Sequence, residues 1–399
     1  MVPMKILQVA NSFKYAWGSG GVARVAYDIS LSLTKRGHKV TVFTTDKGLG
    51  ESYSVKTNNP ISLDGMQVYY FRNLSRGLAR KGIAIPFYSL FIVRKILPEF
   101  DVIHIHELRR IINILIYYYA RKYSIPYIFQ AHGSILSSKS RHKRILSWIF
   151  DTLFGYKLLK DASKVIALTR IEAQQYENVG IPEEEIAIIP NGIDLSEYAD
   201  LPPKGAFKKK FGIKEDEKIV LYVGRIHESK GLDILTYAFN AITKNFGDVR
   251  LVVIGPDDGY LATFSRLISD LGIKEKILLT GFVDKKDKLA AFIDSDVFVT
   301  PRFYGFPITF LEACLASCPI VTASDELDWI NNNVGYVTEY SSNALAKGVA
   351  NVLQDEQINR KFRNNCRHMI KKFDISTVTS QLENIYKVCS CDYYEKTID

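Results

Sequence analysis

Two cations share one short loop that follows an apolar segment. Arg225 and Lys230 lie within Gly224–Gly231, directly after the apolar run 219–223. Arginine presents a planar fork of N–H donors and lysine a compact charge, so the two side chains together suit a diphosphate. Solvated surface charges are the alternative interpretation. A glycine-rich loop at the corresponding place in the first half of the chain favours the diphosphate.

That glycine-rich loop contains Gly18, Gly20 and Gly21 and precedes an expected helix. Small residues there let backbone N–H groups at the helix start approach an anion closely. The spacing of Gly18, Gly20 and Ala23, with Asp46 near the end of the next strand, also satisfies the dinucleotide-binding fingerprint. A nicotinamide-dependent oxidoreductase is therefore one hypothesis, although the loop is long for that fingerprint. A purely structural glycine loop is another.

A second anion-binding helix start is predicted after Pro307. Proline fits the first turn of a helix, which leaves the N–H groups of Ile308 and Thr309 directed outward. Glu312 lies on an otherwise apolar stretch of the same helix. Its carboxylate is therefore expected either to form a structural pair or to bind a ligand hydroxyl.

His104 and His106 alternate along an expected strand. With no third ligand near them in the sequence they make a weak metal site, so no metal is expected. We expect His104 to be packed in the interior and His106 to lie at the edge of a cleft.

The elements that would position these residues form two β-α-β starts. Apolar residues at helical spacing follow each of the two loops. Pro202, Pro203 and Gly205 interrupt the pattern between residues 196 and 207, which makes this stretch the candidate linker. Continuous β-branched runs typical of strands buried on both faces of a parallel sheet stand at 5–9, 39–43, 101–105, 126–129, 165–168, 219–223 and 249–254.

The predicted fold class is α/β, with two doubly wound Rossmann-like domains facing each other across a cleft. Ligands of such sheets bind at the carboxyl ends of the strands, where both loops would lie. The expected domains are residues 1–200 and 201–374. The tail 375–399 is expected to cross back onto the first domain.

The composition is that of a folded protein, with 47% hydrophobic and 24% charged residues in 399. No apolar stretch reaches the roughly 18–20 residues that a membrane-spanning helix needs. The start of the chain lacks the layout of a signal peptide, so a cytoplasmic location is expected. The five cysteines have no zinc-type spacing and are expected to be reduced and mostly buried.

Several of these motifs occur together and in a fixed order, and as a set they are specific. With them the chain resembles the family-four retaining glycosyltransferases of GT-B fold, such as glycogen synthase and phosphatidylinositol mannosyltransferase. The resemblance covers nearly the whole sequence. The motifs are Gly20-Gly21, Ala131-His132-Gly133, Ile189–Asp194, Gly224-Arg225 with Lys230-Gly231, Leu251–Gly255, and Gly305-Phe306-Pro307 through Leu311-Glu312-Ala313.

The resemblance implies a nucleoside-diphosphate-sugar donor of UDP or GDP type and a glycan or lipid-linked acceptor. By analogy Arg225 and Lys230 grip the diphosphate, Glu312 accepts the ribose hydroxyls, and His132 faces the donor sugar, with His106 also on the acceptor side. His132, Arg225 and Lys230 form the expected catalytic set, and no cofactor, metal or protein nucleophile is implied. The implied donor-binding residues are Gly20, Gly21, Arg225, Lys230, Gly281, Phe282, Val283, Tyr304, Gly305, Phe306, Ile308, Thr309 and Glu312.

One departure from the family pattern concerns the sugar itself. The family usually has two glutamates in the pattern Glu-x7-Glu, and Tyr304 stands where the first would fall. A non-catalytic GT-B subunit that binds nucleotide sugar or glycan therefore remains an alternative. The nicotinamide-dependent oxidoreductase is a third hypothesis, and it leaves Arg225, Lys230 and Glu312 unexplained.

Two basic segments suggest a further partner. Residues 72–98 carry six basic and no acidic residues, and residues 139–160 carry six basic residues against Asp151. Aromatic residues lie among them, a mixture that suits an anionic lipid surface, and the formal net charge of +9 agrees. A solvated helix face over a packed core is the alternative, and nucleic acid is not expected. Peripheral association with the inner face of the membrane follows as an expectation.

Overall fold

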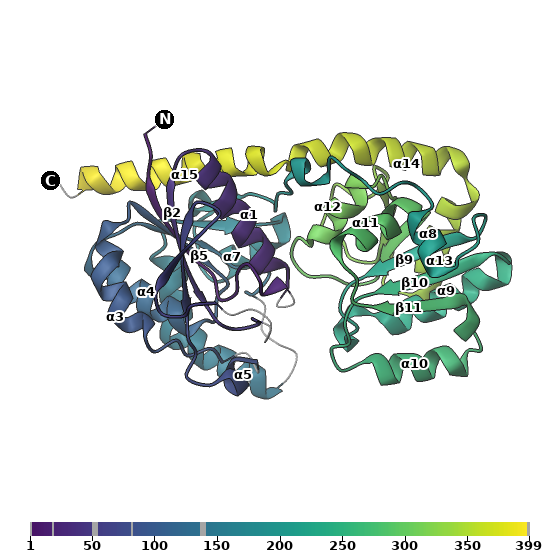
Figure 1. The fold of residues 1–399 in the computed structure, drawn as a ribbon, viewed down its shortest axis with the longest axis horizontal. Helices are drawn as coiled ribbons and strands as arrows, with labels where there is room; N and C mark the ends of the chain where they lie inside the picture. The colour runs from purple at the N-terminus through teal and green to yellow at the C-terminus, as the bar shows by residue number, and fades with distance from the viewer. Residues whose placement is uncertain (1, 18–19, 50–54, 81–82, 136–140, 397–399) are drawn as a thin grey trace. The chain divides into compact units, whose positions relative to one another are not determined.

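The computed structural model describes residues 2–17, 20–49, 55–80, 83–135 and 141–396 (Figure 1). The chain divides into two compact units. The N-terminal unit extends to Asp194 and resumes at Ile375, and the C-terminal unit spans Leu195–Asp374.

In its described residues the N-terminal unit holds an eight-stranded sheet in the order β3-β4-β2-β1-β5-β6-β7-β8. Neighbouring strands are parallel except β3 and β4, so the parallel strands all end at one edge. The inner strands are buried on both faces, in agreement with their continuous apolar sequences. The strands are β1 Lys5–Val9, β2 Lys39–Thr45, β3 Pro60–Leu63, β4 Met66–Phe71, β5 Val102–His106, β6 Tyr127–Gln130, β7 Lys164–Ala167 and β8 Ile186–Ile188.

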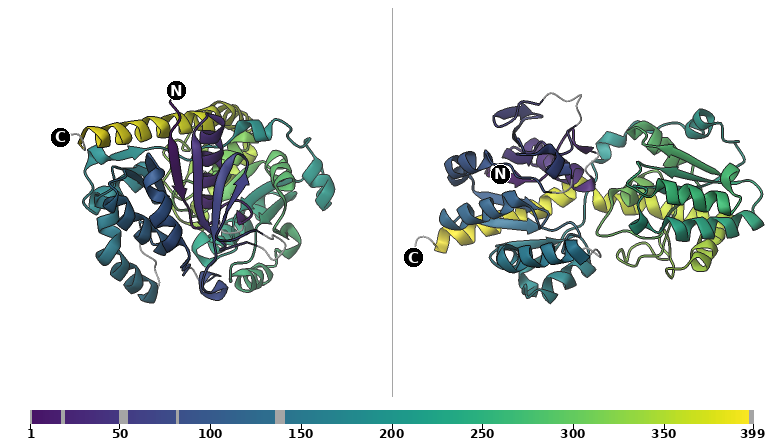
Figure 2. Two further views of the ribbon diagram at one scale, coloured as in Figure 1. Left: turned by 60° about the vertical axis from the view of Figure 1, so that its left-hand side comes forward. Right: turned by 90° about the horizontal axis from the view of Figure 1, so that it is seen from below.

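Helices connect these strands and cover the sheet (Figures 1 and 2). Their inward faces, above all those of α3, α4 and α7, join the sheet in one hydrophobic core. The helices are α1 Gly21–Lys35, α2 Arg76–Arg80, α3 Ser89–Ile96, α4 Ile111–Lys122, α5 Arg141–Phe150, a π-helical turn Asp151–Gly155, α6 Tyr156–Lys160, α7 Arg170–Asn178 and α15 Ile375–Lys396, with 3-10 turns Leu97–Glu99 and Glu183–Glu185.

The described part of the C-terminal unit contains a six-stranded, wholly parallel sheet in the order β11-β10-β9-β12-β13-β14. Helices α9 and α13 pack on its core. The strands are β9 Lys218–Val223, β10 Val249–Ile254, β11 Ile277–Gly281, β12 Val297–Thr300, β13 Ile320–Thr322 and β14 Gly335–Val337. The helices are α8 Ala206–Phe211, α9 Leu232–Asn245, α10 Leu261–Asp270, α11 Lys285–Asp294, α12 Ile308–Leu315, α13 Ser342–Gln354 and α14 Glu356–Met369, with 3-10 turns Leu195–Tyr198, Glu228–Lys230, Lys274–Lys276 and Ile370–Phe373.

The predicted fold class of two Rossmann-like α/β domains with parallel sheets is confirmed. The stretch 196–207, predicted as a linker, is more ordered than expected. It contains most of the turn Leu195–Tyr198 and the start of α8, where the buried Asp294 carboxylate accepts hydrogen bonds from the backbone N–H groups of Gly205, Phe207 and Lys208. Pro307 is the residue before α12 rather than part of its first turn.

All five cysteines are free thiols, and only Cys391 is exposed. This agrees with the expectation of reduced, mostly buried thiols. Among the described residues, no helix combines the length and the apolar character that crossing a membrane requires.

The C-terminal helix α15 packs beside α1 in the N-terminal unit (Figures 1 and 2). A buried carboxylate, Glu383, fastens it: Oε2 accepts from Arg36 at 2.8 Å and Oε1 lies 2.7 Å from His38 Nε2. Burial acts to raise the pKa of Glu383, but the hydrogen bonds from Arg36 and His38 outweigh it and lower that pKa below its ordinary value of 4.5. The folded protein therefore holds Glu383 in its charged form.

We expect Glu383→Gln to lower the free energy of unfolding by about 3 kcal/mol at pH 7, because it leaves Arg36 with an uncompensated charge. A carboxylate with a depressed folded pKa stabilises above its unfolded pKa, and this stabilisation disappears as the pH falls through the folded value. Urea unfolding of the wild type should therefore lose stability below about pH 4.5, and the variant should lose less. Glu177→Gln, at an exposed carboxylate of α7, is the control; equal effects of the two substitutions would contradict the assignment.

Candidate functional site

The loop after β9 packs directly against the loop after β12 in the C-terminal unit. Gly231, which precedes α9, has φ 70°, and a Cβ there would lie 3.1 Å from Pro301 Cβ and 2.7 Å from Tyr340 Oη. β9 and β12 are neighbours in the sheet, so their carboxyl ends are adjacent. The loop of Arg225 and Lys230 thus lies against the loop that leads to the predicted anion-binding start of α12.

Lys230 is half-buried in this loop. Burial lowers the pKa of its ammonium group, the positive charge of Arg225 lowers it further, and Glu326 acts in the opposite direction. Within the described residues, no side chain forms a hydrogen bond or ion pair with the Lys230 ammonium group. Arg225 is half-exposed and forms an ion pair with Asp258 in the loop after β10. The positive charge at Lys230 is only partly neutralised, which favours an anionic ligand.

Glu326 is a neighbour of this loop that sequence analysis missed. Its Oε2 accepts a hydrogen bond of 2.7 Å from the backbone N–H of Gly305, across 21 residues of sequence. A carboxylate therefore lies beside Tyr304, where the family pattern has its first glutamate. No spacing in the sequence connects Glu326 with Gly305, since the contact depends on how the loops after β12 and β13 fold.

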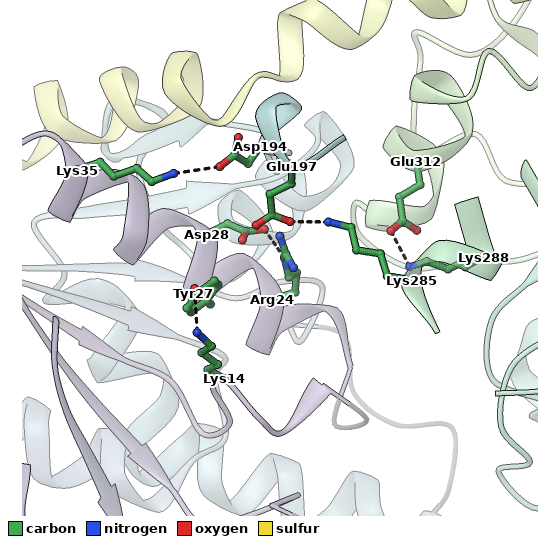
Figure 3. Close-up of polar contacts among 10 residues, drawn as sticks. All are labelled: Lys14, Arg24, Tyr27, Asp28, Lys35, Asp194, Glu197, Lys285, Lys288 and Glu312. Carbon is green, nitrogen blue, oxygen red and sulfur yellow. Dashed lines mark hydrogen bonds and ion pairs between the residues drawn. The ribbon is translucent and has the colours of Figure 1, made fainter. Parts of the chain in front are cut away.

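Helix α12 follows the same loop. No described group accepts a hydrogen bond from the N–H of Ile308 or Thr309, the first two residues of α12. Glu312, one turn further, is 3% exposed, and its Oε1 accepts from Lys288 Nζ at 2.6 Å (Figure 3). Its Oε2 is buried without a partner among the described residues. Glu312 is thus paired through one oxygen and retains hydrogen-bonding capacity at the other.

The side chains predicted to contact the donor differ in exposure. Tyr304 is 42% and Phe282 76% exposed, and Phe282 lies in the loop after β11 between Gly281, with φ 68°, and the half-buried Val283. Phe306 is 5% exposed and packs against Trp329 and Phe373. At Phe306, therefore, only the backbone is placed to meet a ligand.

The glycine loop of the N-terminal unit ends at Gly20 and Gly21, where α1 begins. A Cβ on either residue would meet no described heavy atom within 4 Å, so the backbone there is open to a ligand. The first turns of α1 carry the Arg24–Asp28 ion pair and Tyr27, which Lys14 contacts (Figure 3). Gly18 of the dinucleotide fingerprint lies outside the described residues.

His132 follows β6 in a left-handed backbone conformation, φ 54°, and is half-buried. Its Nε2 lies 2.8 Å from Nδ1 of His106. His106 does not lie at a cleft edge as expected, because its side chain is 0% exposed behind His132. Burial lowers the pKa of His132 to about 4 and that of His106 well below 6.5. Both rings are therefore neutral at pH 7.

Asp46 is paired through one oxygen. Its Oδ1 accepts hydrogen bonds from the backbone N–H and the side-chain amide of Asn73, and its Oδ2 is buried without a partner among the described residues. In the described part of the chain, no three His, Cys, Asp or Glu side chains are grouped closely enough to hold a metal ion.

Two family models match successive parts of the chain. The model "Glycosyltransferase Family 4" matches residues 19–197, and "Glycosyl transferases group 1" matches residues 203–369. Together they cover most of the sequence. The chain belongs to the family-four glycosyltransferases. This assignment leaves the oxidoreductase hypothesis without support.

Solved structures with the same architecture are GT-B glycosyltransferases. The Anabaena protein HepE, solved with UDP-glucose, has a TM-score of 0.76 at 20% identity, covering 96% of this chain and 100% of that one. WaaG, a glycosyltransferase of lipopolysaccharide biosynthesis, has a TM-score of 0.66 at 17% identity, covering 96% and 99%. The glycosyltransferase described here therefore has the GT-B fold.

Relatives in sequence are also glycosyltransferases. An uncharacterised glycosyltransferase of Methanocaldococcus jannaschii is 24% identical over 92% of this chain and 94% of its own length. The phosphatidyl-myo-inositol mannosyltransferase of Mycobacterium tuberculosis is 26% identical over 72% of this chain and 74% of its own.

We propose that Arg225 and Lys230 bind the diphosphate of a nucleotide. Arg225→Ala and Lys230→Ala are each expected to weaken binding of UDP or GDP by about 1.5–3 kcal/mol, because each removes a charge-assisted hydrogen bond. Calorimetric titration measures the loss. Lys244→Ala, at an exposed lysine near the end of α9, should bind as the wild type does; unchanged affinity in both site variants would refute the assignment.

Proposed function

We propose that this glycosyltransferase is a retaining, metal-independent enzyme that transfers a sugar from a nucleoside-diphosphate-sugar to a hydroxyl group. The donor is of UDP or GDP type, and the acceptor is a glycan or a lipid-linked precursor. The half-buried ammonium group of Lys230, lacking a described side-chain partner and facing Arg225, is the observation that carries the proposal. A diphosphate would supply the direct anionic partner that Lys230 lacks among the described side chains.

The remaining residues of the C-terminal unit fit complementary roles. The N–H groups of Ile308 and Thr309 lie at the start of α12, the positive end of the helix dipole, and donate hydrogen bonds to phosphate oxygens. The Oε2 atom of Glu312 accepts a ribose hydroxyl, and the exposed Phe282 ring lines the base. In the N-terminal unit, the open backbone at Gly20 and Gly21 admits the donor, and His132 faces the sugar.

The chemistry proposed is stabilisation of the leaving diphosphate. As the bond between the sugar and the phosphate oxygen breaks, negative charge accumulates on that oxygen. Fixed cations and helix N–H groups stabilise it without reorganising. The acceptor oxygen forms the new bond to the anomeric carbon of the sugar, and its proton passes to the departing phosphate. No protein nucleophile is assigned. Retention of configuration is proposed from the resemblance to the family, and a nucleotide-sugar donor is also suggested by the structural neighbour HepE, which was solved with UDP-glucose.

A non-catalytic binding subunit is the second candidate, and Tyr304 is the observation that favours it. An exposed phenol replaces a carboxylate of the family pattern. The Glu326 carboxylate beside Gly305 argues in the other direction, because it keeps an acidic group in that loop.

Turnover separates the two candidates. We expect the wild type to hydrolyse UDP-glucose or GDP-mannose slowly in the presence of EDTA. The sugar released first should have the same anomeric configuration as the donor. Proton NMR measures both the rate of hydrolysis and the anomer released. Tyr304→Glu should change this rate by less than about tenfold, since Glu326 already supplies a carboxylate. No turnover in the wild type together with a large gain in Tyr304→Glu would instead indicate a degenerate binding protein.

We also propose that the N-terminal unit associates with an anionic membrane surface. Exposed apolar side chains lie on α3 and on the stretch from α5 to the following π-helical turn, among them Phe91, Trp148 and Leu153. Asp151, the acidic residue of the second basic segment, is buried in an ion pair with Arg109. Its negative charge is therefore neutralised within the protein by Arg109, so it does not oppose the attraction of this segment to anionic lipid.

Flotation with phosphatidylglycerol-containing vesicles tests this surface. The wild type should float at low salt and less at high salt, because screening weakens attraction to the lipid charge. Phe91→Ser with Trp148→Ser should reduce flotation, whereas Tyr237→Ser, at an exposed tyrosine of the C-terminal unit, should not. No flotation of the wild type at low salt would leave these segments as ordinary solvated helix faces.

A further inference from the structure

A chain of polar side chains leads from His132 to the C-terminal helix α15. His132 Nε2 lies 2.8 Å from His106 Nδ1, and His106 Nε2 lies 2.8 Å from Gln8 Oε1. Gln8 Nε2 donates to Tyr386 Oη at 3.4 Å, and that hydroxyl lies 2.7 Å from His104 Nδ1. Apart from His132, these side chains are each 0% exposed. The loop after β6 is thereby connected through β5 and β1 to α15.

The hydrogen-bonding capacity of each group sets the direction of this chain. Gln8 Oε1 carries no hydrogen, so His106 Nε2 carries one and donates it. Because the His106 ring is neutral at pH 7, its Nδ1 then has no hydrogen and accepts. His132 Nε2 must donate to it. In a neutral His132 this leaves Nδ1 with an unshared electron pair.

The inner end of the chain is consistent with the same direction. Tyr386 accepts from Gln8 and so donates its own hydrogen to His104 Nδ1. The proton of His104 is then on Nε2, which is buried without a partner among the described residues, as is Gln130 Oε1. Burial lowers the pKa of His104, and the side chain of Gln130 acts to raise it, as an oxygen facing that N–H would. Along each part of the series the hydrogen bonds point in the same direction, so each one polarises and strengthens its neighbours.

We propose that Gln8, His106 and Tyr386 are positioning residues that hold His132 in the tautomer protonated on Nε2, so that Nδ1 accepts a hydrogen bond from a hydroxyl of the substrate sugar. The role in sugar binding rests on the proposed function, whereas the tautomer does not. Helix α15 thus contributes to sugar recognition from the far end of the sequence without touching the substrate. If the Gln8 amide were turned by 180°, every hydrogen bond in this series would reverse its direction, and the hydrogen of His132 would then be on Nδ1.

Nitrogen-15 NMR of the histidine rings in the full-length, ligand-free protein at pH 7 tests the tautomer directly. In the wild type His132 should show a protonated Nε2 and an unprotonated Nδ1. Tyr386→Phe removes the acceptor for Gln8 Nε2 and frees the amide to turn, so His106 and His132 should become mixtures of tautomers. Ser390→Ala removes a buried hydroxyl one turn further along α15. Ser390 is not part of this series of side-chain hydrogen bonds, so the substitution should leave the spectrum unchanged.

Function is measured on the same variants. Tyr386→Phe should reduce hydrolysis of UDP-glucose or GDP-mannose about tenfold while keeping wild-type affinity for UDP or GDP, which lack the sugar. Loss of nucleotide affinity as well would indicate general structural damage and contradict a positioning role, as would unchanged hydrolysis. A proton on Nδ1 of His132 in the wild type would overturn the tautomer, and an unchanged spectrum in Tyr386→Phe would overturn the positioning role of Tyr386. Absence of any turnover in the wild type would overturn the proposed function and the sugar-binding role, while the spectrum would still decide the tautomer.

Discussion

The partly neutralised positive charge at Lys230 is the constraint on which the functional interpretation depends. Arg225 has Asp258 as its partner, whereas no described side chain forms an ion pair with the half-buried Lys230, so an anion bound at this loop would stabilise the lysine charge. The structure imposes this arrangement through close loop packing: Gly231 has no room for a side chain against Pro301 and Tyr340, and a Cβ on Gly255 would collide with the carbonyl oxygen of Gly224. The parallel sheet then places these loops at the edge where α12 also begins.

The two units contribute different electrostatic properties. The C-terminal unit offers cations and helix N–H groups, as a leaving diphosphate requires. The N-terminal unit offers open glycine backbone and a neutral histidine, which we propose meets sugar hydroxyls rather than charge. A division of this kind is consistent with chemistry that has no protein nucleophile, because positioning and charge stabilisation then supply most of the catalysis.

The sequence predicts the framework well because its signals are local. Strands such as β9 and β10 are runs of mostly apolar residues, and each glycine loop marks a strand-to-helix turn, so the fold class followed from pattern alone. What failed depends on contacts between distant residues. Alternation showed that His104 and His106 share a face, but not that Tyr386, some 280 positions later, covers that face. Glu326 was missed for the same reason, since only the folded loops bring it to Gly305.

The central claim is that the loop of Arg225 and Lys230 holds the diphosphate of a sugar nucleotide without a metal. Calorimetric titration of the full-length protein with UDP, GDP, ADP and NAD, in the presence of EDTA, tests it most directly. We expect binding of one nucleoside diphosphate, UDP or GDP, which would also name the base of the donor. Binding of NAD alone, or of none of the four, would contradict it.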